Sequence, residues 1–302
     1  MPPTYRNIKS TAPEASIQFG TMLATTFGTL NWLPIPDGQI HRFYVPGDRV
    51  GSHNGWYVLF PDGIASGCFG SWKTGSSHIW SSRRPANHLE AHLVAQRIQQ
   101  AQRQREIEQH QRQQAAAEYA AQLWRDALRA DPRHPYLIAK GCQAHDLRQS
   151  GSVLLVPLYH AGVLVNLQRI GPDGGKRFLS GGMVRGCYSP LGIMTAGQPL
   201  YLCEGWATGA TIHENTGHPV ACAMNTGNLL PVGLSLRHRF PNAVLIVAGD
   251  DDRQTEGNPG RTYATKAAVA LSCGLIFPPW SGAEPLNLSD FNDLQQWRGA
   301  NQ

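Results

Sequence analysis

Three consecutive aspartates, Asp250 to Asp252, follow the apolar run AVLIVAG in this sequence of 302 residues. Adjacent carboxylates repel one another, and one polar side chain is enough to begin a helix. A bound divalent cation would relieve the repulsion, and Mg²⁺ prefers carboxylate oxygens as ligands. The pattern predicts a metal site with a phosphate behind it. The alternative is that the aspartates form a solvated turn or cap a helix.

A second carboxylate occupies a comparable position. Glu204 follows the apolar segment PLYLC and is itself followed by Gly205, which we expect to permit a tight turn. Gly249 precedes the aspartates and is expected to allow a close approach of the backbone. If both segments are parallel strands, Glu204 and the pair Asp250 and Asp252 lie at the same edge of one sheet.

The elements that would position these carboxylates alternate along the C-terminal part of the chain. The strands are predicted to be PLYLCEG, PVACAM, AVLIVAG and LIFPP, and the helices WATGATIHENTG, LPVGLSLRHRF and GRTYATKAAVALSCG. Such alternation is typical of an α/β domain in which helices cover both faces of a mostly parallel, Rossmann-like sheet.

The N-terminal part of the chain has a different character. Between about Ile40 and Ser82, short apolar runs alternate with P-G, N-G, P-D-G and F-G breaks, which predicts a small antiparallel β-sheet built from hairpins. Its aromatic residues are expected to form the core, although some could instead stack nucleic-acid bases on an exposed face. They are Trp56, Tyr57, Phe60, Phe69 and Trp72.

A long helix is predicted between these parts, because residues 88–131 contain neither Gly nor Pro and are rich in Gln, Ala, Arg and Glu. Its first half is expected to be solvated, or alternatively to track phosphates through its arginines. Its end should dock on a core through Tyr119, Leu123, Trp124, Ala127 and Leu128. The expected divisions are 1–87, a helical linker 88–132, a basic segment 133–195 and the α/β domain 196–302.

Charge, cysteine spacing and the lack of certain motifs restrict the classes of function that this sequence could have. The formal net charge of +5 favours an anionic partner such as nucleic acid. The six cysteines form no C-x-x-C pair, so no zinc is expected. GCFGSWKTG lacks the glycine that a phosphate loop places before its lysine, which argues against a built-in ATPase. No long apolar run or signal-peptide core is apparent, so we expect a cytoplasmic protein with no membrane partner.

Four segments carry a family resemblance: LCEGWATGATIHENTG, AMNTGNL, AGDDDRQTEGNPGRTYATKAA and SDFNDL. They resemble the TOPRIM domain, and more closely the primases of plasmids and phages of the conjugative TraC type and the P4 phage type. The E-G-[YW]-A-T motif corresponds to residues 204–208, with Trp206 in place of the frequent Tyr. The resemblance covers about residues 133–298. It implies a TOPRIM core preceded by an α+β subdomain.

The resemblance implies DNA primase activity, that is, synthesis of short RNA primers on single-stranded DNA by nucleotidyl transfer. It assigns the catalytic and metal-binding roles to Glu204, Asp250 and Asp252, with Mg²⁺ or Mn²⁺ as the cofactor. Whether Glu204 is a ligand or a general base stays open. Asp290 and Asp293 in SDFNDL are expected to complete the metal site, with helix capping by Asp290 or Asn292 as the alternative.

Basic residues would hold the triphosphates and the template. The candidates are Lys140 in LIAKG, Arg169 in NLQRI, and the adjacent Lys176 and Arg177 in DGGKRF. The last pair follows the turn GPDGG and should project from a hairpin, with a solvated hairpin face as the alternative.

Two further positions are predicted to contact nucleotide or DNA. Gly205 lies beside the glutamate, and Asn228 lies in NTGNL just before a predicted helix, where backbone amides can meet a phosphate. A plain helix cap is the alternative for Asn228.

The expected partners are a single-stranded DNA template, ribonucleoside triphosphates and a separate replicative helicase or relaxase. The resemblance also points to a bacterial protein encoded by a plasmid, phage or other mobile element. Two alternatives stay open: a TOPRIM nuclease, and a non-catalytic single-stranded-DNA-binding protein that assists replication. Many primases carry an N-terminal zinc module, and this sequence has no Cys or His set with that spacing.

Overall fold

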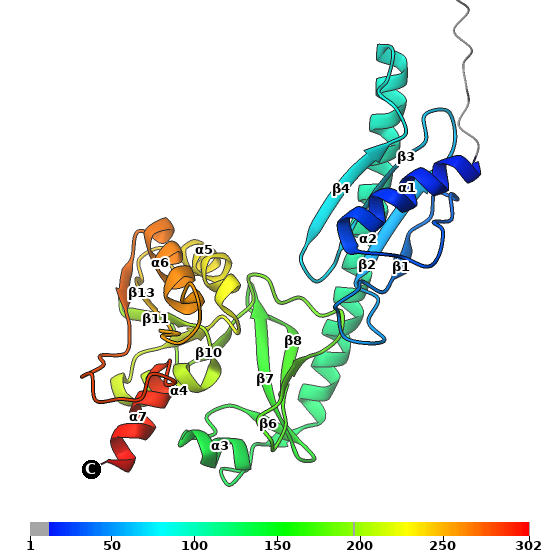
Figure 1. Cartoon of the computed structure of the whole chain (residues 1–302). Helices are drawn as coiled ribbons and strands as arrows, with labels where there is room; N and C mark the ends of the chain where they lie inside the picture. Colours follow the sequence, from blue (N-terminus) through cyan, green and yellow to red (C-terminus); the bar gives the residue numbers. More distant parts are fainter. Residues whose placement is uncertain (1–11, 196, 302) are drawn as a thin grey trace, which may run out of the picture. The chain divides into compact units, whose positions relative to one another are not determined.

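The computed structural model describes residues 12–195 and 197–301 (Figure 1). The chain divides into two compact units, Met1–His110 and Gln111–Gln302, and each is described by itself. The expectation that the N-terminus lacks a signal peptide concerns residues that lie largely outside the described ones. Within the described residues, no helix combines the length and the apolar character needed to span a bilayer.

The first unit contains a four-stranded antiparallel sheet, as the turn pattern predicts. Its strands occur in the order β1-β2-β3-β4 along the sheet. Their bounds are His41–Phe43, Gly55–Phe60, Ser66–Ser71 and Ser76–Ser81. One face is covered by the helix α1 (Ala12–Phe27), which the sequence does not predict.

The aromatic side chains of this sheet form its core. Trp56, Tyr57 and Phe69 are all buried. Tyr57 and Phe69 pack towards α1, whereas Trp56 packs on the opposite face. The prediction of core packing is confirmed for these three residues, and the alternative of an exposed stacking face is wrong for them.

The predicted long helix is present as α2 (His88–Asp126), with 39 residues. The expectation that its first half is solvated is wrong for one of its faces. Val94 and Ala101 are buried there, and Ala101 contacts the sheet beside Trp56. The guanidinium of Arg105 lies 5.1 Å from the centroid of the Trp56 ring. The packing of small and aliphatic side chains against a tryptophan therefore replaces the expected solvation.

The end of α2 docks on a core in the second unit, as predicted, but through fewer residues. Leu123 and Trp124 pack against a buried cluster on the neighbouring sheet, and Ala127 joins them. Tyr119 is 55% exposed and Leu128 is 78% exposed, so the prediction is wrong for these two. Leu128 lies beyond the end of the helix, in a short strand, where helical spacing no longer applies.

The second unit begins with a five-stranded antiparallel sheet and a short helix, which confirms the expected α+β subdomain. The strands occur in the order β5-β6-β7-β8-β9. Their bounds are Leu128–Arg129, Arg148–Ser150, Val153–His160, Val163–Ile170 and Lys176–Phe178. The helix α3 spans Pro135–Lys140.

The second sheet of this unit is the predicted, mostly parallel one. Its order is β10-β12-β11-β13-β14, and only β10 is antiparallel to its neighbour. The strand bounds are Ser189–Leu191, Pro199–Cys203, Val220–Cys222, Val244–Ala248 and Gly274–Ile276 for β10 to β14. The α/β fold class is therefore confirmed.

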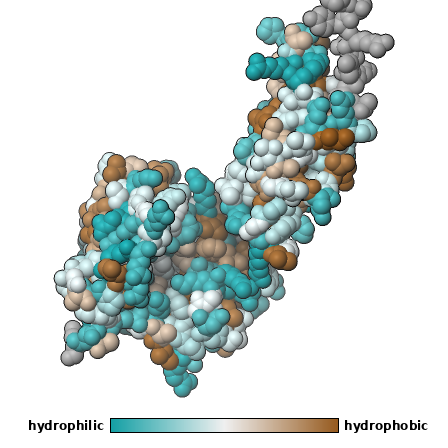
Figure 2. Space-filling model, viewed as in Figure 1, coloured by the Kyte–Doolittle hydropathy of each residue, from teal (hydrophilic) through white to brown (hydrophobic). Residues whose placement is uncertain are grey.

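Helices cover both faces of the parallel sheet (Figure 1). Helices α4 (Trp206–Thr216) and α7 (Phe291–Ala300) contact each other and pack on one face. Helices α5 (Leu229–Arg239) and α6 (Pro259–Leu271) pack on the other, after the single turn η1 (Thr226–Asn228). The visible surface of the described residues is mostly hydrophilic, with scattered apolar patches (Figure 2).

Candidate active site at the edge of the parallel sheet

The candidate catalytic carboxylates follow two adjacent strands. Strands β11 and β13 are parallel neighbours, and Cys203 pairs with Ala248 at the carboxyl end of the ladder. Glu204 comes directly after the first of these residues and Asp250 two residues after the second. The expectation that both acidic segments leave the same edge of one sheet is therefore confirmed.

The electrostatics of Glu204 and Asp250 show that acidic side chains gather here. Burial, and next the charge of Asp252, raises the pKa of Glu204 to about 7. Burial raises the pKa of Asp250 to about 9, reinforced first by Asp290 and then by Glu204, Asp252 and Asp293. Burial and Asp293 also raise the pKa of Asp290. The five predicted metal-site residues thus interact electrostatically around Asp250.

The chemistry of this cluster suits a divalent cation. Oδ1 of Asp250 is buried and has no hydrogen-bond partner among the described residues. A cation would supply that missing partner and remove the mutual repulsion of the carboxylates. Within residues 12–195 and 197–301, no three His, Cys, Asp or Glu side chains already form a metal-ligand group. All candidate donors are carboxylate oxygens, which Mg²⁺ and Mn²⁺ accept as ligands.

The middle aspartate has a separate role. Asp251 is buried and receives two hydrogen bonds from the guanidinium of Arg261, at 2.9 and 2.8 Å. Asn258 Nδ2 and Trp280 Nε1 also donate to it, at 2.7 and 3.1 Å. These partners, the Arg261 hydrogen bond first, lower the pKa of Asp251 to about 2. Asp251 therefore fixes helix α6 to the sheet edge, and a solvated turn is excluded for it.

Asp252 belongs to the acidic group around Asp250 and also contacts the first turn of helix α6. Its Oδ2 accepts a hydrogen bond of 2.7 Å from the backbone N–H of Gly260 in the first turn of α6. Its own backbone N–H donates to Oδ1 of Asn258, the residue that caps this helix. The helix-start alternative is thus correct for one oxygen of Asp252, while its charge still acts on Glu204 and Asp250.

Asp290 caps helix α7, as the capping alternative predicts. Its Oδ1 accepts from the backbone N–H of Asp293 at 2.8 Å, and its Oδ2 accepts from the hydroxyl of Thr208 at 3.0 Å. Asp293 in turn accepts from the backbone N–H of Ser289 at 3.1 Å. These contacts resemble a capping box and hold both carboxylates beside the sheet edge.

Asn292 does not cap the helix. It is fully buried, and its Nδ2 donates to the carbonyl oxygen of Lys140 and to the hydroxyl of Thr211, at 2.7 and 2.9 Å. It therefore ties α7 to α3 and α4.

Two of the four predicted basic residues accompany the carboxylates. Nζ of Lys140 lies 3.4 Å from Oδ1 of Asp293. Lys176 is partly desolvated by its surroundings, which lowers its pKa, and Lys140 lowers it further. The negative charges of Asp290, Glu204 and Asp250 oppose that shift, which places the Lys176 ammonium within their field.

The other two basic residues lie on the opposite face of their sheet. Lys176 pairs with Ile170 across β8 and β9, whereas Arg177 pairs with Arg169. Neighbouring residues of a strand point to opposite faces, so Arg177 and Arg169 point away from Lys176. Strand alternation therefore separates Lys176 from Arg177 although both follow the predicted hairpin turn, and contact of Arg169 and Arg177 with nucleotide or DNA stays a prediction.

Asn228 is a structural residue. Its Oδ1 accepts from the backbone N–H of Gly186 at 2.7 Å, and its Nδ2 donates to the carbonyl oxygens of Val184, Cys187 and Ala223. These bonds occupy its whole amide. The side chain of Asn228 is therefore engaged within the fold, and it makes no capping hydrogen bond to α5, so the capping alternative is wrong. Contact of the backbone amides of NTGNL with a phosphate stays a prediction.

The two glycines beside the carboxylates differ. Gly205 has φ −93° and ψ 153°, an extended conformation open to any residue, so a tight turn does not require it. A Cβ at Gly249 would lie 2.5 Å from both Ala264 Cβ and Phe277 Cε1. The expected close approach is therefore confirmed at Gly249 only. A contact of Gly205 with nucleotide stays a prediction.

Tyr136 is a residue of this region that the sequence does not single out. Its side chain is buried, and its hydroxyl has no hydrogen-bond partner among the described residues. Burial, and then Cys142 and Asp290, raises its pKa. The Lys176 ammonium lies 5.5 Å from the centroid of its ring. In the segment PYLIAKG this tyrosine has the spacing of an ordinary core residue, so no sequence signal could have identified it.

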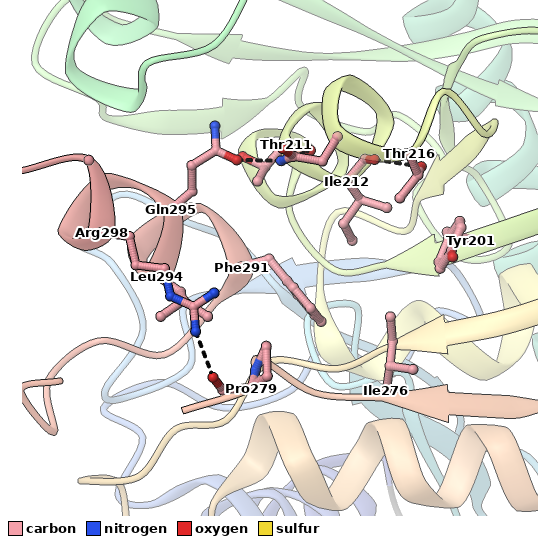
Figure 3. Close-up of a pocket in the computed structure, with 12 residues that line it drawn as sticks. Tyr201, Thr211, Ile212, Thr216, Ile276, Pro279, Phe291, Leu294, Gln295 and Arg298 are labelled. Atoms are coloured by element: carbon pink, nitrogen blue, oxygen red, sulfur yellow. Dashed lines mark hydrogen bonds between the residues drawn. The ribbon is translucent and has the colours of Figure 1, made fainter. Parts of the chain in front are cut away.

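A separate pocket of about 490 Å³ lies between the sheet, α4 and α7 (Figure 3). Its lining includes the side chains of Tyr201, Ile212 and Phe291, and Arg298, which also lines it, donates to the carbonyl oxygen of Pro279. None of its lining residues is a predicted site residue. The pocket is therefore distinct from the carboxylate cluster.

Comparison with known proteins places the site in a named domain. Residues 199–301 match the family model of the Toprim domain. The chain is also 36% identical over 264 residues to a DNA primase TraC of Escherichia coli, covering 83% of this chain and 18% of that protein. A second Escherichia coli DNA primase TraC is 36% identical over 268 residues, covering 83% of this chain and 25% of that protein.

These matches confirm the resemblance to a TOPRIM primase of the TraC type. The chain spans between 18% and 25% of the length of these curated relatives. Among solved structures, a primase of Aquifex aeolicus containing zinc-binding and RNA polymerase domains is similar with a TM-score of 0.39 and 14% identity. That similarity covers 97% of this chain and 85% of the other.

Proposed function

We propose that this Toprim-containing chain is a DNA primase that joins ribonucleotides on a single-stranded DNA template by metal-dependent nucleotidyl transfer. The observation that carries the proposal is the gathering of acidic side chains from separate segments around Asp250, at the carboxyl edge of the Toprim sheet. Sequence identity of 36% to DNA primases along most of the chain supports this chemistry over others at the same fold.

The residues assigned to hold Mg²⁺ or Mn²⁺ are the five of the carboxylate cluster, namely Glu204, Asp250, Asp252, Asp290 and Asp293. When bound, such a metal neutralises the charge that develops on the transferred phosphoryl group. In its absence the half-buried carboxyl of Asp250 holds a proton at neutral pH and that of Glu204 is partly protonated, since their pKa values are raised to about 9 and about 7. Metal binding is therefore expected to release protons.

The chain's own residues have distinct roles in this proposal. Lys176 and Lys140 attract the triphosphate to a site that would otherwise repel it, because an ammonium is a compact positive charge. Glu204 serves either as a metal ligand or as a general base, and without metal its pKa of about 7 allows it to accept a proton at neutral pH. Asp251 takes no part in the chemistry, since Arg261 and Asn258 occupy its oxygens.

The proposed partners follow from this reaction. They are a single-stranded DNA template, ribonucleoside triphosphates and a separate helicase or relaxase that supplies the single strand. We assign template contact to the N-terminal unit as well, through edges and loops, because α1 and α2 cover the two faces of its sheet. The proposed setting is the cytoplasm of a bacterium that carries a plasmid, phage or other mobile element.

Primer synthesis on single-stranded DNA with labelled ribonucleotides and Mg²⁺ tests the proposal. We expect the unaltered chain to make short RNA. Glu204→Gln and Asp250→Asn should each lower the rate at least about 100-fold, since each removes a charge at the reacting centre. Glu256→Gln is the matched control, because Glu256 is an exposed carboxylate in the loop before α6 and should leave the rate unchanged.

The outcomes separate the proposed function from its alternatives. Equal primer yield from both site variants would show that the site is wrongly assigned. Cleavage of DNA without RNA synthesis would identify a Toprim nuclease. Binding of single-stranded DNA with neither activity would identify a replication accessory protein.

A further inference from the structure

One face of the antiparallel sheet β5 to β9 carries a row of arginines. The cross-strand pairs are Arg129 with Arg148, Arg148 with Leu155, Leu155 with Arg169, and Arg169 with Arg177. Directly paired residues of antiparallel strands point to the same face. Four arginines and one leucine therefore form a single row that crosses all five strands.

The row lies on the face away from the carboxylates. Its central Leu155 is fully buried against Ala120 of α2, and Trp124 of α2 packs on the same cluster. The opposite face carries Leu154 and Ile170, which pack with Trp206 of the Toprim domain. The arginine row and the catalytic cluster are thus separated by the thickness of the sheet.

Arg148 is already engaged within the fold. Its guanidinium lies 5.0 Å from the centroid of the Trp124 ring and donates hydrogen bonds to carbonyl oxygens at the end of α2, those of Trp124, Arg125 and Ala127. A cation at this position donates hydrogen bonds to the free carbonyl groups at the end of the helix and is attracted by the negative end of the helix dipole. The structural role of this one arginine therefore explains its presence.

The other three arginines have no such explanation. Arg129, Arg169 and Arg177 are exposed, and none has an ion-pair or hydrogen-bond partner within the range that the structure describes. Arg169 and Arg177 are also direct cross-strand partners, and like charges in that position destabilise a sheet. An anion that bridges the two guanidinium groups would remove this cost.

The spacing suits an extended anion. Neighbouring strands lie about 4.8 Å apart, so Arg129 on β5 and Arg177 on β9 are about 19 Å apart along the row, while Arg148 and Leu155 between them are covered by the end of α2. A single small anion cannot span that distance, whereas a chain of phosphates that passes over the end of α2 can contact the exposed arginines on both sides of it. Guanidinium groups also hold phosphates through paired hydrogen bonds.

We propose that Arg129, Arg169 and Arg177 form a second phosphate-binding surface, which holds the backbone of the single-stranded template on the face of the β5–β9 sheet opposite the catalytic cluster. This inference rests on the proposed function for the identity of the strand. It changes the role of Arg169 and Arg177 from contacts with the reacting triphosphate to contacts with the template at a distance from the chemistry.

The test measures DNA and nucleotide binding separately in the full chain. A variant with Arg129→Ala, Arg169→Ala and Arg177→Ala is titrated with a fluorescent oligo-dT over a range of salt concentrations. We expect at least a tenfold loss of affinity at low salt. The slope of log affinity against log salt should decrease by about 2, since each phosphate contact to a single strand contributes about 0.7. Affinity for a fluorescent ribonucleoside triphosphate should stay within twofold.

Two further variants serve as controls. Replacement of the same three arginines by lysine keeps the charge but not the paired guanidinium hydrogen bonds, so it should retain most of the salt slope. The unchanged nucleotide affinity of the alanine variant excludes misfolding as the cause of the loss. Arg133→Ala removes an exposed arginine that already pairs with Asp131 and should leave the salt slope unchanged.

Unchanged DNA affinity in the alanine variant would overturn the proposal and would leave an acidic protein as the candidate partner of this face. Loss of nucleotide affinity with normal DNA affinity would also overturn it, because the arginines would then belong to the triphosphate site. Both measurements are made without primer synthesis. Failure of the proposed primase activity therefore leaves this result interpretable.

Discussion

Asp250 and Asp251 are neighbours in the chain, yet their carboxyl groups have opposite environments. Burial among other acidic groups raises the pKa of Asp250 to about 9, whereas the Arg261 guanidinium and Asn258 amide lower the pKa of Asp251 to about 2. The two aspartates should therefore affect stability in opposite directions. The charged form of Asp250 should lower the free energy of unfolding when no metal is bound. The charged form of Asp251 should raise it, because its hydrogen bonds hold α6 in place.

Stability without metal should depend on pH through Asp250. Its carboxyl pKa is 3.8 in the reference state and about 9 when folded, so the folded protein holds the extra proton between these values. The free energy of unfolding in the presence of a chelator should therefore fall as the pH rises from about 4 towards 9. Asp250→Asn should reduce this slope and stabilise the protein at pH 8 by about 1 kcal/mol or more, measured by urea unfolding.

Asp251→Asn is the comparison variant in this experiment, because it makes the same change at the adjacent residue. It removes the charge that accepts from Arg261, so we expect a loss of about 1–3 kcal/mol at pH 8. The Asp251 contribution should disappear only as the pH falls towards 2, where the folded carboxyl is protonated. A stabilising Asp251→Asn, or a pH slope that Asp250→Asn leaves unaltered, would contradict the assigned environments.

At this residue scale the sequence predicts the outer aspartates and Glu204 because their positions after two strands follow from apolar patterning. The partner of Asp251 lies ten residues further on, beyond a loop and an αL residue at Asn258. Whether Arg261 reaches back to Asp251 depends on the path of the loop between them, and the residue types alone do not determine that path.

The elements beside the site differ in how closely they pack. Gly249 directly follows β13 at a point where α6 and Phe277 leave no space for a side chain, whereas a Cβ at Gly205 would meet only the Thr208 hydroxyl at 3.5 Å. Gly249→Ala should therefore cost about 1–3 kcal/mol through overpacking, measured by denaturant unfolding. Gly205→Ala should change stability by less than about 0.5 kcal/mol.

Equal effects of the two substitutions would show that the contacts around Gly249 relax freely. The comparison is direct because neither residue has a positive φ, so the backbone adds no strain in either case. The difference measures only how tightly α6 is seated against the strand that carries Asp250.

Elements of the α/β domain are predictable from sequence because strands and helices there alternate with clear apolar periods. Helix α1 is not, since its sequence APEASIQFGTMLATTF contains a glycine and several threonines, which are weak helix formers. Its helical form depends on Phe19, which packs edge-on against Phe69 and Trp80 of the sheet. Because Phe69 and Trp80 are far from Phe19 in the sequence, these contacts produce no local sequence pattern that would predict the helix.

The whole molecule consists of two units whose buried clusters share no residue. The first unit is held by clusters around Phe19 and Trp56, and the second by clusters around Trp206, Val247 and Leu155. The division falls within α2, between His110 and Gln111, a position that composition alone does not reveal because the helical pattern continues across it. Separate cores predict separate unfolding events.

Calorimetry of the full chain in a chelator should therefore show two transitions, only one of which responds to metal. Excess Mg²⁺ should raise the transition of the Gln111–Gln302 unit by several degrees, because binding at 100 times Kd adds about 2.7 kcal/mol to the stability of the unit that binds. Trp56→Ala should lower only the other transition, since this fully buried ring belongs to the first unit. Asp250→Asn should abolish the Mg²⁺ response without moving the first unit. If Mg²⁺ raised both transitions together, or still stabilised Asp250→Asn, the cation would bind elsewhere and the carboxylate cluster would lose its assigned role.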